Sequence, residues 1–270
     1  MQSRGAKMRN PIRVATTTDD TLRRLFDILF AGASLLLTAP VLLASLVALY
    51  LQDFRSPLYL GRRIGLNGRP FTLLKFRSMV IDAHKVPIDT TSANDPRITP
   101  LGRIMRRFKV DEFPQFLNVL VGDMGIVGPR PQVPRETALY TEAEKRLLSV
   151  RPGITDLASI VFSDLDRIVA SEPDPDIAYN QLVRPWKSRI GLFYIDNRSL
   201  VLDVSIIALT VLNFVSRRQT LRLLAALMRR LGASSELVAV AERRHKLQPA
   251  PPPGSDKIVE SRTPNPGRPD

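Results

Sequence analysis

Apolar residues in this chain form one long uncharged run, followed by shorter segments with helical or strand spacing. The run Ile28–Leu51 holds about 24 residues and no charged side chain. At ~1.5 Å per residue, a helix of this length is able to cross the ~30 Å hydrocarbon core of a bilayer. The run is too long for the apolar part of a cleavable signal peptide, and no small-x-small site follows it. It therefore predicts a membrane segment.

The path of this segment is open from the residues alone. Arginine occurs on both sides of the run, at positions 9, 13, 23 and 24 before it and at 55, 62 and 63 after it. Positive charge marks the cytoplasmic side, so both ends favour the cytoplasm. Pro40 deletes a helical hydrogen bond and disfavours helix at Ala39, which allows a bend and a return through the same leaflet. Without further information, a plain span is the favoured interpretation and the re-entrant path is the alternative.

The remaining pattern predicts a small hairpin and several helices. Leu58–Arg63 and Pro70–Phe76 flank an Asn67-Gly68 turn, which is a strong hairpin signal. Residues 82–100 are expected to be a loop, and residues 102–109 and 136–148 helices. Residues 200–215 and 221–231 have amphipathic spacing that suits either the membrane interface or packing against the core. The Pro-rich segment after residue 248 predicts a disordered tail that catalysis does not need.

Composition narrows the chemistry. The chain has no cysteine and two histidines, His84 and His245, which argues against disulfides, thiolate catalysis and His-rich metal sites. Its net charge of +13 predicts a polyanionic partner. Nucleic acid is one candidate, but aromatic residues are few, no nucleic-acid motif is found, and the hydrophobic segment stays unexplained. An anionic membrane together with nucleotide and lipid phosphates accounts for the charge equally well.

The segment Lys109–Pro131, KVDEFPQFLNVLVGDMGIVGPRP, carries the candidate chemistry. Asp111 and Glu112 precede Pro114 and an apolar series of helical spacing, which places them at a helix N-terminus, where negative charge is favoured. Glycines recur at positions 122, 125 and 128, and Arg130 stands between two prolines. Two carboxylates, a glycine-rich bend and a fixed guanidinium suit metal-assisted attack on a phosphate. The alternative is a pair of surface acids that cap a helix.

Several ordered blocks resemble the bacterial sugar transferases, the monotopic phosphoglycosyl transferases that initiate surface-glycan synthesis. The resemblance covers roughly residues 21–216. Its blocks are Arg24-Leu-Phe-Asp27, Asn67-Gly-Arg-Pro-Phe71, Lys75-Phe-Arg-Ser-Met79, Asp111-Glu-Phe-Pro-Gln115, Gly122-Asp-Met124, Gly128-Pro-Arg-Pro131 and Arg151-Pro-Gly-Ile-Thr155. Each block alone is weak, but seven in order are specific.

The resemblance implies a reaction and a set of residue roles. Asp111 attacks the sugar-proximal phosphate of a UDP-sugar, UMP leaves, and a polyprenyl (undecaprenyl) phosphate then takes the sugar phosphate from the aspartyl intermediate. Asp111 and Glu112 hold Mg²⁺, and Arg130 clamps a phosphate oxygen. The other residues expected to bind substrate are Lys75, Arg77, Arg106, Arg151, Gln115 and Asn118, although a solvated strand edge is the simpler interpretation of Lys75 and Arg77 taken alone. Ala39-Pro40 becomes the break of a re-entrant helix, and Asp27 a partner for a nearby arginine.

The resulting fold class is α/β, mostly helical with a small hairpin or sheet. A compact cytosolic catalytic domain, residues 53–216, follows a disordered basic N-terminus, residues 1–20, and a re-entrant membrane helix, residues 21–52. A basic amphipathic helical extension, residues 217–247, and the tail, residues 248–270, complete the chain. The expected place is the cytoplasmic leaflet of the inner membrane, without a nucleic-acid partner and with homo-oligomerisation left open.

The sugar is not specified by these patterns. The family commonly continues Thr-Gly where this chain has Thr155-Asp156, and residues 162–167 replace an expected polar segment. These departures affect substrate identity and not the reaction class. Glucose, galactose and N-acetylated hexosamines all remain open. A polytopic transferase of similar activity is the other enzyme considered, but it requires many membrane spans and the chain offers one candidate.

Overall fold

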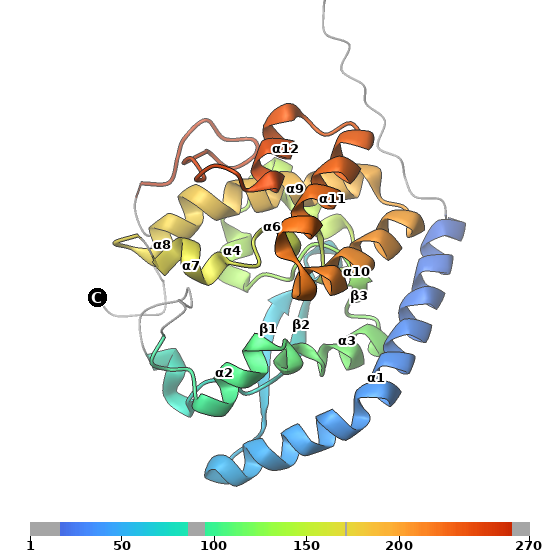
Figure 1. Cartoon of the computed structure of the whole chain (residues 1–270), viewed down its shortest axis with the longest axis vertical. Coiled ribbons are helices and arrows are strands. Elements are labelled where there is room, and N and C mark those ends of the chain that lie inside the picture. The colour runs from blue at the N-terminus through green and yellow to red at the C-terminus, as the bar shows by residue number, and fades with distance from the viewer. Residues whose placement is uncertain (1–16, 86–94, 171, 261–270) are drawn as a thin grey trace, which may run out of the picture.

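A long N-terminal helix and a helical domain dominate the computed structural model, which describes residues 17–85, 95–170 and 172–260. Helix α1 (Thr17–Asp53) runs down one side of the domain and then turns beneath it (Figure 1). Residues 1–16 of the predicted disordered region 1–20 lie outside the described residues. Residues 17–20 are already helical, so the membrane helix begins earlier than predicted.

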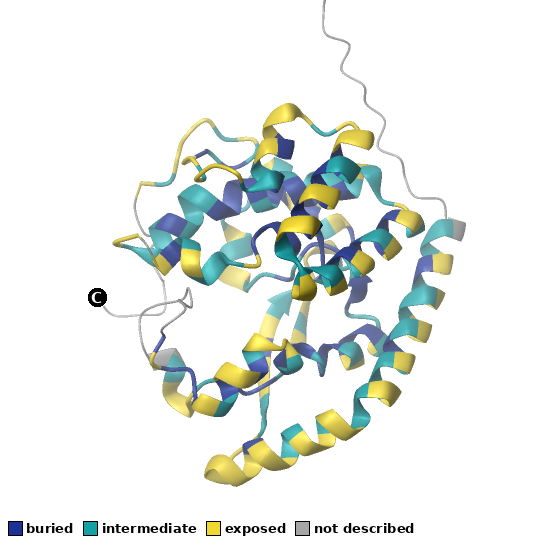
Figure 2. Cartoon of the chain, in the orientation of Figure 1, coloured by how far each residue is buried: buried dark blue, intermediate teal, exposed yellow. Residues whose placement is uncertain are grey.

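Helix α1 passes through Pro40 as one element, so a break into two helices at Ala39-Pro40 is not seen, although Figure 1 shows that its two halves point in different directions. Only 6% of its most apolar window is buried, and Leu36 and Leu37 are 81% and 83% exposed. Exposed and half-buried residues follow its length in Figure 2. It is the one helix in the described residues that is long and apolar enough to cross a membrane.

The other elements are shorter than α1 and mostly helical. The strands are β1 (Leu58–Ile64), β2 (Pro70–Phe76), β3 (Gly125–Val127) and β4 (Gly153–Thr155). The α-helices after α1 are α2 (Pro100–Arg107), α3 (Gln115–Val121), α4 (Pro134–Ala138), α5 (Glu142–Lys145), α6 (Leu157–Val161), α7 (Leu165–Ala170), α8 (Pro175–Ala178), α9 (Arg184–Asn197), α10 (Leu200–Val215), α11 (Arg217–Arg230) and α12 (Ser235–Glu242). The short helical turns are η1 (Leu66–Gly68), η2 (Ile81–Lys85), η3 (Val110–Glu112), η4 (Arg146–Ser149) and the π-helical η5 (Tyr179–Val183). The helix predicted over residues 136–148 is divided among α4, α5 and η4, and the predicted loop 82–100 begins within the helical turn η2.

The predicted hairpin is confirmed. Strands β1 and β2 pair antiparallel, with Leu58 opposite Phe76 and Ile64 opposite Pro70. The turn places Asn67 at φ 55° and Gly68 at φ 76°, a backbone region that asparagine and glycine tolerate better than other residues. The Asn-Gly pair therefore fixes the turn, and the hairpin holds Lys75 at a defined position near the end of β2.

A second, parallel pair of strands brings two glycine-containing loops together. Gly125 pairs with Gly153 and Val127 with Thr155. A Cβ built on Gly153 would lie 2.1 Å from the backbone nitrogen of Gly128, which no side chain tolerates. This close approach fixes the direction in which the chain leaves β3, and the Pro-Arg-Pro segment follows immediately.

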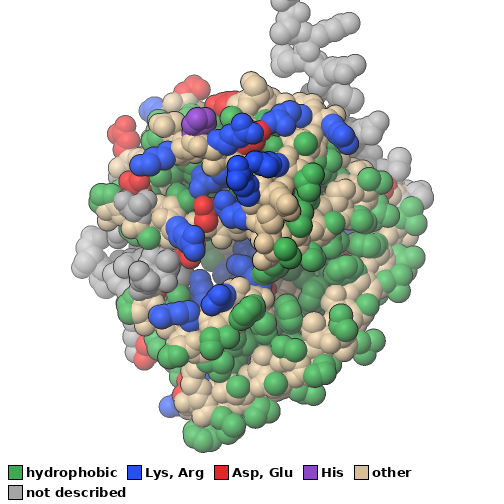
Figure 3. Space-filling model, viewed as in Figure 1, with side chains coloured by type: hydrophobic (Ala, Val, Ile, Leu, Met, Phe, Trp, Pro, Cys, Tyr) green, Lys and Arg blue, Asp and Glu red, His purple; other side chains and the backbone are tan. Residues whose placement is uncertain are grey.

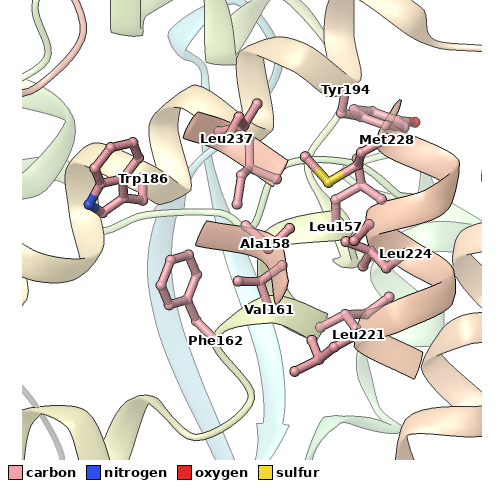
Figure 4. Packing of buried hydrophobic residues seen from close by; sticks show 14 of the residues in the cluster. Leu157, Ala158, Val161, Phe162, Trp186, Tyr194, Leu221, Leu224, Met228 and Leu237 are labelled. Carbon is pink, nitrogen blue, oxygen red and sulfur yellow. The ribbon is translucent and has the colours of Figure 1, made fainter. Parts of the chain in front are cut away.

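The main core lies among α6, α9, α10, α11 and α12. Leu157, Ala158, Val161 and Phe162 of the α6 region lie close to Leu221, Leu224 and Met228 of α11 and to Leu237 of α12 (Figure 4). Burying an aliphatic or aromatic side chain of this kind contributes about 1.5–3 kcal/mol. This core keeps α6 and α9 in place, and both helices carry residues that line the site described below.

The two predicted amphipathic helices differ in what covers their apolar faces. In α11, Leu221, Leu224 and Met228 are buried in the core, so core packing, and not the membrane interface, explains its pattern. In α10, one face is also buried, but Val211 and Val215 are 63% and 82% exposed. Of the two interpretations, core packing therefore holds for the apolar face of α11, whereas α10 keeps an exposed apolar strip on the outside of the domain.

The C-terminal segment packs against the domain as far as residue 260, so the predicted disorder does not hold for residues 248–260. Trp186 Nε1 donates to the Gln248 carbonyl at 3.3 Å, and Ala250 N donates to the Gln181 carbonyl at 3.1 Å. Thr141 Oγ1 donates to the Pro253 carbonyl at 2.5 Å. The segment thus joins α9 and η5 to the start of α5. Composition did not indicate this packing, because the contacts use backbone groups of the segment, the Gln248 and Pro253 carbonyls and the Ala250 amide, and not its side chains.

Deleting residues 249–270 removes the hydrogen bonds of Ala250, Pro253 and Val259 but keeps that of Gln248, and is expected to lower the melting temperature by roughly 6–12 °C. Each lost hydrogen bond of this kind is worth about 1 kcal/mol, and 1 kcal/mol shifts the melting temperature of a domain this size by about 2–4 °C. Thermal unfolding of the purified protein measures the effect, with deletion of residues 261–270 alone as the reference. An identical melting temperature for both deletions would show that the segment adds no stability.

Candidate active site

Basic side chains surround a hollow on one face of the molecule. Figure 3 shows Lys and Arg over α2 on one side and over α7 and the helices around α11 on the other. The segment from α2 to α3, which carries the acid pair, passes below this hollow. Thr99 caps α2, Lys109 adopts a left-handed backbone at φ 58°, and the turn η3 then presents Asp111 and Glu112 immediately before α3. Both carboxylates are buried.

Glu112 is held by two cations from different elements. Lys75 Nζ of β2 lies 3.0 Å from Glu112 Oε1, and the Arg130 guanidinium contacts both carboxylate oxygens, with Nη1 3.3 Å from Oε2. Burial alone would raise the pKa of Glu112, but Arg130 and Lys75 outweigh it and hold that pKa well below the usual range of a glutamate. Glu112 is therefore ionised and its direction is fixed.

Asp111 differs from its neighbour because it is unpaired. Its side chain is 5% exposed, and Oδ1 has no hydrogen-bond partner among the described residues. Buried polar atoms are usually paired, so an orphaned carboxylate oxygen marks a functional position or a ligand position. In the acid pair, Glu112 thus binds the two cations, and Asp111 has no such partner and is available to react.

Arg130 is positioned through its backbone as well as its side chain. Its amide nitrogen donates to Asp156 Oδ2 at 3.2 Å, while Asp156 Oδ1 caps the first turn of α6. Interaction with Glu112 raises the pKa of Arg130 despite burial. With prolines on both sides, the guanidinium is presented from a rigid segment, as a phosphate clamp requires.

Three of the predicted substrate-binding residues make hydrogen bonds within the fold. Arg77 Nη1 and Nη2 each contact Asp53 at 2.6 Å, and its Nε donates to the Ser56 carbonyl. Arg151 Nε donates to the Gly122 carbonyl at 3.1 Å. Asn118 links α3 to β2, because Nδ2 donates to the Thr72 carbonyl and Oδ1 accepts from Leu74 N. These contacts fasten α1, α3 and the hairpin around the acid pair.

The other two lie near the acid pair without such bonds. Gln115 is 1% exposed in the first turn of α3, and its Nε2 has no partner among the described residues. Arg106 is half-buried near the end of α2, on the side of Asp95. Gln115 therefore offers an unused donor in the first turn of α3, and Arg106 adds positive charge to the α2 side of the site.

The Arg-Leu-Phe-Asp block fastens α1 to the domain. Arg23 forms a buried ion pair with Asp203 of α10, which also accepts from Tyr194 Oη at 2.7 Å. Arg24 donates to the Val119 and Leu120 carbonyls at the end of α3 at 2.6 and 2.9 Å. Asp27 accepts from the Ile126 amide of β3 at 2.9 Å. The predicted arginine partner is Arg24, which interacts with Asp27 electrostatically and without a hydrogen bond.

The acid pair is also the place to look for a metal. Within the described ranges, no group of three or more His, Cys, Asp and Glu side chains gathers closely enough to hold an ion. Asp111 and Glu112 fit Mg²⁺ nevertheless, because this ion binds hard oxygen donors, keeps several waters and takes one or two carboxylates plus substrate phosphates. The unpartnered Oδ1 of Asp111 is the observation that favours this fit.

Sequence reasoning missed the residues on the other side of Arg130. A pocket there is lined by Asp156, Tyr140, Tyr179 and Lys187, among others. Asp156 had a signal, since it replaces the glycine common in the family, but the pattern did not show that it holds Arg130. No sequence pattern pointed to Tyr179 and Lys187, because they come from η5 and α9, more than forty residues along the chain from the acid pair.

The comparisons with known proteins identify the family. A family model described as Bacterial sugar transferase matches residues 18–217, and the chain belongs to that family.

Three relatives illustrate the family. An uncharacterised sugar transferase EpsL of Bacillus subtilis is 36% identical over 191 residues, covering 70% of this chain and 85% of the relative. A UDP-glucose:undecaprenyl-phosphate glucose-1-phosphate transferase of Escherichia coli is 38% identical over 142 residues, 52% of this chain and 31% of that protein. A UDP-N-acetylgalactosamine-undecaprenyl-phosphate N-acetylgalactosaminephosphotransferase of Aeromonas hydrophila is 34% identical over 197 residues, which cover 70% of this chain and 43% of that protein. The names of the Escherichia coli and Aeromonas hydrophila relatives state different sugars, glucose and N-acetylgalactosamine.

Proposed function

We propose that this protein transfers a sugar 1-phosphate from a UDP-sugar to a polyprenyl phosphate in two steps, and so initiates assembly of a surface glycan. An Asp111 oxygen attacks the sugar-proximal phosphorus, the bond to the bridging oxygen breaks, and UMP leaves with the electron pair. A phosphate oxygen of the polyprenyl carrier then attacks the same phosphorus and releases Asp111. The product is a polyprenyl diphosphosugar. The observation that carries this proposal is the buried, unpaired carboxylate of Asp111 next to a clamped Glu112.

Lys75 and Arg130 supply positive charge where the transferred phosphate collects negative charge. Both form salt bridges with Glu112 and interact with Asp111 only through the weaker electrostatic attraction of a nearby charge, so they hold Glu112 in place and leave Asp111 without a salt bridge. Fixed donors that stabilise developing charge usually contribute more to the rate of such reactions than any other single effect. Glu112 prevents the two cations from pairing with Asp111, which would make that carboxylate a weaker nucleophile.

Mg²⁺ would be held by Asp111 and Glu112 together with the substrate phosphates. When bound, such an ion neutralises phosphate charge and orients the leaving group. Glu112 contributes through an oxygen already shared with a cation, so affinity for the ion in the absence of substrate is expected to be low.

The membrane helix is proposed to be re-entrant, because both of its ends are fastened to one domain. Near its start, Arg24 and Asp27 bind α3 and β3. At its end, Asp53 binds Arg77, and Leu49 packs on Phe76 and Met105. A straight helix of 35 residues would be ~53 Å long and would place these ends on opposite sides of a bilayer, where one compact domain is unable to hold both.

The same arrangement brings the site to the lipid. Ile104 and Phe108 of the α2 region, just before the acid pair, are 58% and 59% exposed. Leu117 and Val121 of α3 are exposed as well. Apolar side chains around a charged site suit a substrate whose phosphate lies at the membrane surface and whose chain lies in the membrane. The arginines at both flanks favour the cytoplasmic leaflet.

Cysteines at Asn10 and Leu60 are both expected to escape an impermeant thiol reagent added outside intact cells, and to react once the cells are opened. The chain has no native cysteine, so any label reports the new positions alone. Labelling of only one of them from outside would establish a true span. Pro40→Leu is the companion variant, since restoring the backbone donor should favour the straight form.

The reaction class is tested by incubating the membrane-bound protein with a set of UDP-sugars and undecaprenyl phosphate. Release of UMP together with a lipid diphosphosugar is the expected result for at least one sugar. Release of UDP with a lipid monophosphosugar would show glycosyl transfer instead of phosphoglycosyl transfer and would overturn the proposal.

A further inference from the structure

The pocket next to Arg130 is separate from the acid pair but joined to it by that arginine. Its walls come from four places along the chain: the Pro-Arg-Pro segment, the α4–α5 region with Glu136 and Tyr140, the N-cap of α6 with Asp156, and η5–α9 with Tyr179 and Lys187. The Arg130 backbone binds Asp156 on this side, and its guanidinium binds Glu112 on the other. A substrate phosphate at Arg130 therefore has this pocket within reach.

Lys187 is a cation without an ion-pair partner in this pocket. Its Nζ lies 5.5 Å from the ring centroid of Tyr179, and none of the described carboxylates forms a salt bridge with it. The two other cations of the pocket are already bound, Arg184 by Glu144 at 2.8 Å and Arg130 by Glu112. Burial lowers the pKa of Lys187 to about 8, with Asp156 opposing the shift and Arg130 adding to it. An unpaired ammonium in such a site is an available hydrogen-bond donor.

The rest of the lining is mixed in a way that suits a carbohydrate. Burial raises the pKa of the Tyr140 and Tyr179 hydroxyls, so both rings are neutral and carry a hydrogen-bonding group. Asp156 and Glu136 supply acceptors, and Lys187 supplies donors. A pyranose needs both kinds of partner, because each hydroxyl donates and accepts, and aromatic rings cover its apolar face.

We propose that this pocket binds the sugar ring of the UDP-sugar, with Lys187 donating to one ring hydroxyl and thereby determining which sugar is used. The proposal rests on the proposed function for the position of the diphosphate at Arg130. It explains why Asp156, a departure from the family pattern, matters for the substrate: this one carboxylate both positions Arg130 and lines the sugar pocket. The uridine end of the substrate then lies on the opposite side of Arg130.

Lys187→Met tests the assignment with monodeoxy analogues of the preferred UDP-sugar. In the wild type, one analogue should be used about 10–100-fold less well than the parent, because a buried charged donor loses its partner. Lys187→Met should lower kcat/KM for the parent by a similar factor and abolish the difference between parent and that analogue. Inhibition by UMP should stay unchanged. Lys145→Met, an exposed lysine on α5, is the matched control.

Two results would overturn the proposal. If Lys187→Met lowers kcat/KM equally for every UDP-sugar and weakens inhibition by UMP to the same extent, the pocket binds the nucleotide and not the sugar. Equal activity of Lys187→Met and wild type toward parent and analogues would remove the pocket from substrate binding. If Lys187→Met fails to fold, Tyr179→Phe replaces it, since this variant keeps the ring beside Lys187 and removes only the hydroxyl.

A measurement without turnover separates this proposal from the reaction mechanism. An amine-directed reagent at a pH near 8 is expected to modify Lys187 in the Asp111→Asn protein, and the UDP-sugar, but not UMP, is expected to protect it. Protection by UMP alone, or by neither compound, contradicts the sugar pocket. Protection by the UDP-sugar supports it even where the aspartyl intermediate is disproved, so the two proposals fail on different results.

Discussion

Asp111→Asn is expected to abolish transfer while leaving the fold intact. The amide keeps the shape of the side chain but has no charge with which to attack phosphorus, and loss of a covalent nucleophile typically lowers kcat by about 10⁴-fold or more. Stability should be unchanged or slightly raised, since the change removes a buried carboxylate whose Oδ1 has no partner. UMP release with saturating UDP-sugar and lipid, beside thermal unfolding, measures both effects.

Asp196→Asn is the matched control for that experiment. Asp196 is half-exposed and paired with Arg146 at the surface, so both rate and melting temperature should match the wild type. Turnover by Asp111→Asn within tenfold of the wild type, with no deamidation of the new asparagine, would contradict the role of Asp111 as the attacking group.

Glu112→Gln is expected to lower both activity and stability. Gln keeps the acceptor oxygen but removes the carboxylate that forms ion pairs with both Lys75 and Arg130, and loss of one partner of a buried pair typically costs several kcal/mol. The rate should fall about 10²–10³-fold, as when a positioned group that stabilises the transition state is removed. The exposed Glu142, paired with Lys145, provides the control Glu142→Gln, which should change neither quantity because exposed ion pairs contribute little.

The pH dependence of stability gives a second test of Glu112. Its depressed pKa means that Glu112 stabilises the fold above the pKa of a free glutamate, about 4.3, and that this contribution is lost as the pH falls toward its lower value in the folded protein. The difference in melting temperature between wild type and Glu112→Gln should therefore be largest at neutral pH and shrink in acid. A difference that does not vary with pH would mean that Glu112 stabilises the fold by shape and not by charge.

The contrast between the two acids is the feature that sequence alone did not provide. Both are adjacent carboxylates before a helix, and both were assigned as metal ligands. Only the positions of Lys75 on the hairpin and Arg130 after β3 show that one is bound and the other is free. Such long-range pairing has no local signal, because the partners lie 37 and 18 residues away in the chain.

Local patterns predicted local structure well. The Asn67-Gly68 turn fixed the hairpin, and the uncharged run predicted the exposed helix. Periodicity was less informative for α11, since an apolar stripe has the same spacing whether core or lipid covers it, and here the core does. Composition predicted disorder after residue 248, but backbone carbonyls of Gln248, Pro253 and Val259 accept hydrogen bonds from the domain.

The roles of individual residues within the motifs were also harder to predict than the presence of the motifs. Arg77 and Arg151 stand in blocks that resemble the family, and the resemblance implied that they bind phosphate. In the structure Arg77 binds Asp53 at the end of α1, and Arg151 binds the carbonyl after α3. We therefore propose that Arg77 and Arg151 hold α1 and the acid pair in position, and that Lys75 and Arg130 contact the phosphate directly.

The most direct test of the covalent mechanism is a single-turnover experiment without lipid. Enzyme, a UDP-sugar that it turns over, and Mg²⁺ are mixed in the absence of polyprenyl phosphate, and both UMP and the intact protein mass are measured. We predict UMP in an amount limited by the enzyme, a gain of one phosphosugar on the peptide that contains Asp111, and neither signal in Asp111→Asn. UMP that appears only after polyprenyl phosphate is added, with no adduct on the protein, would contradict this mechanism and establish direct transfer.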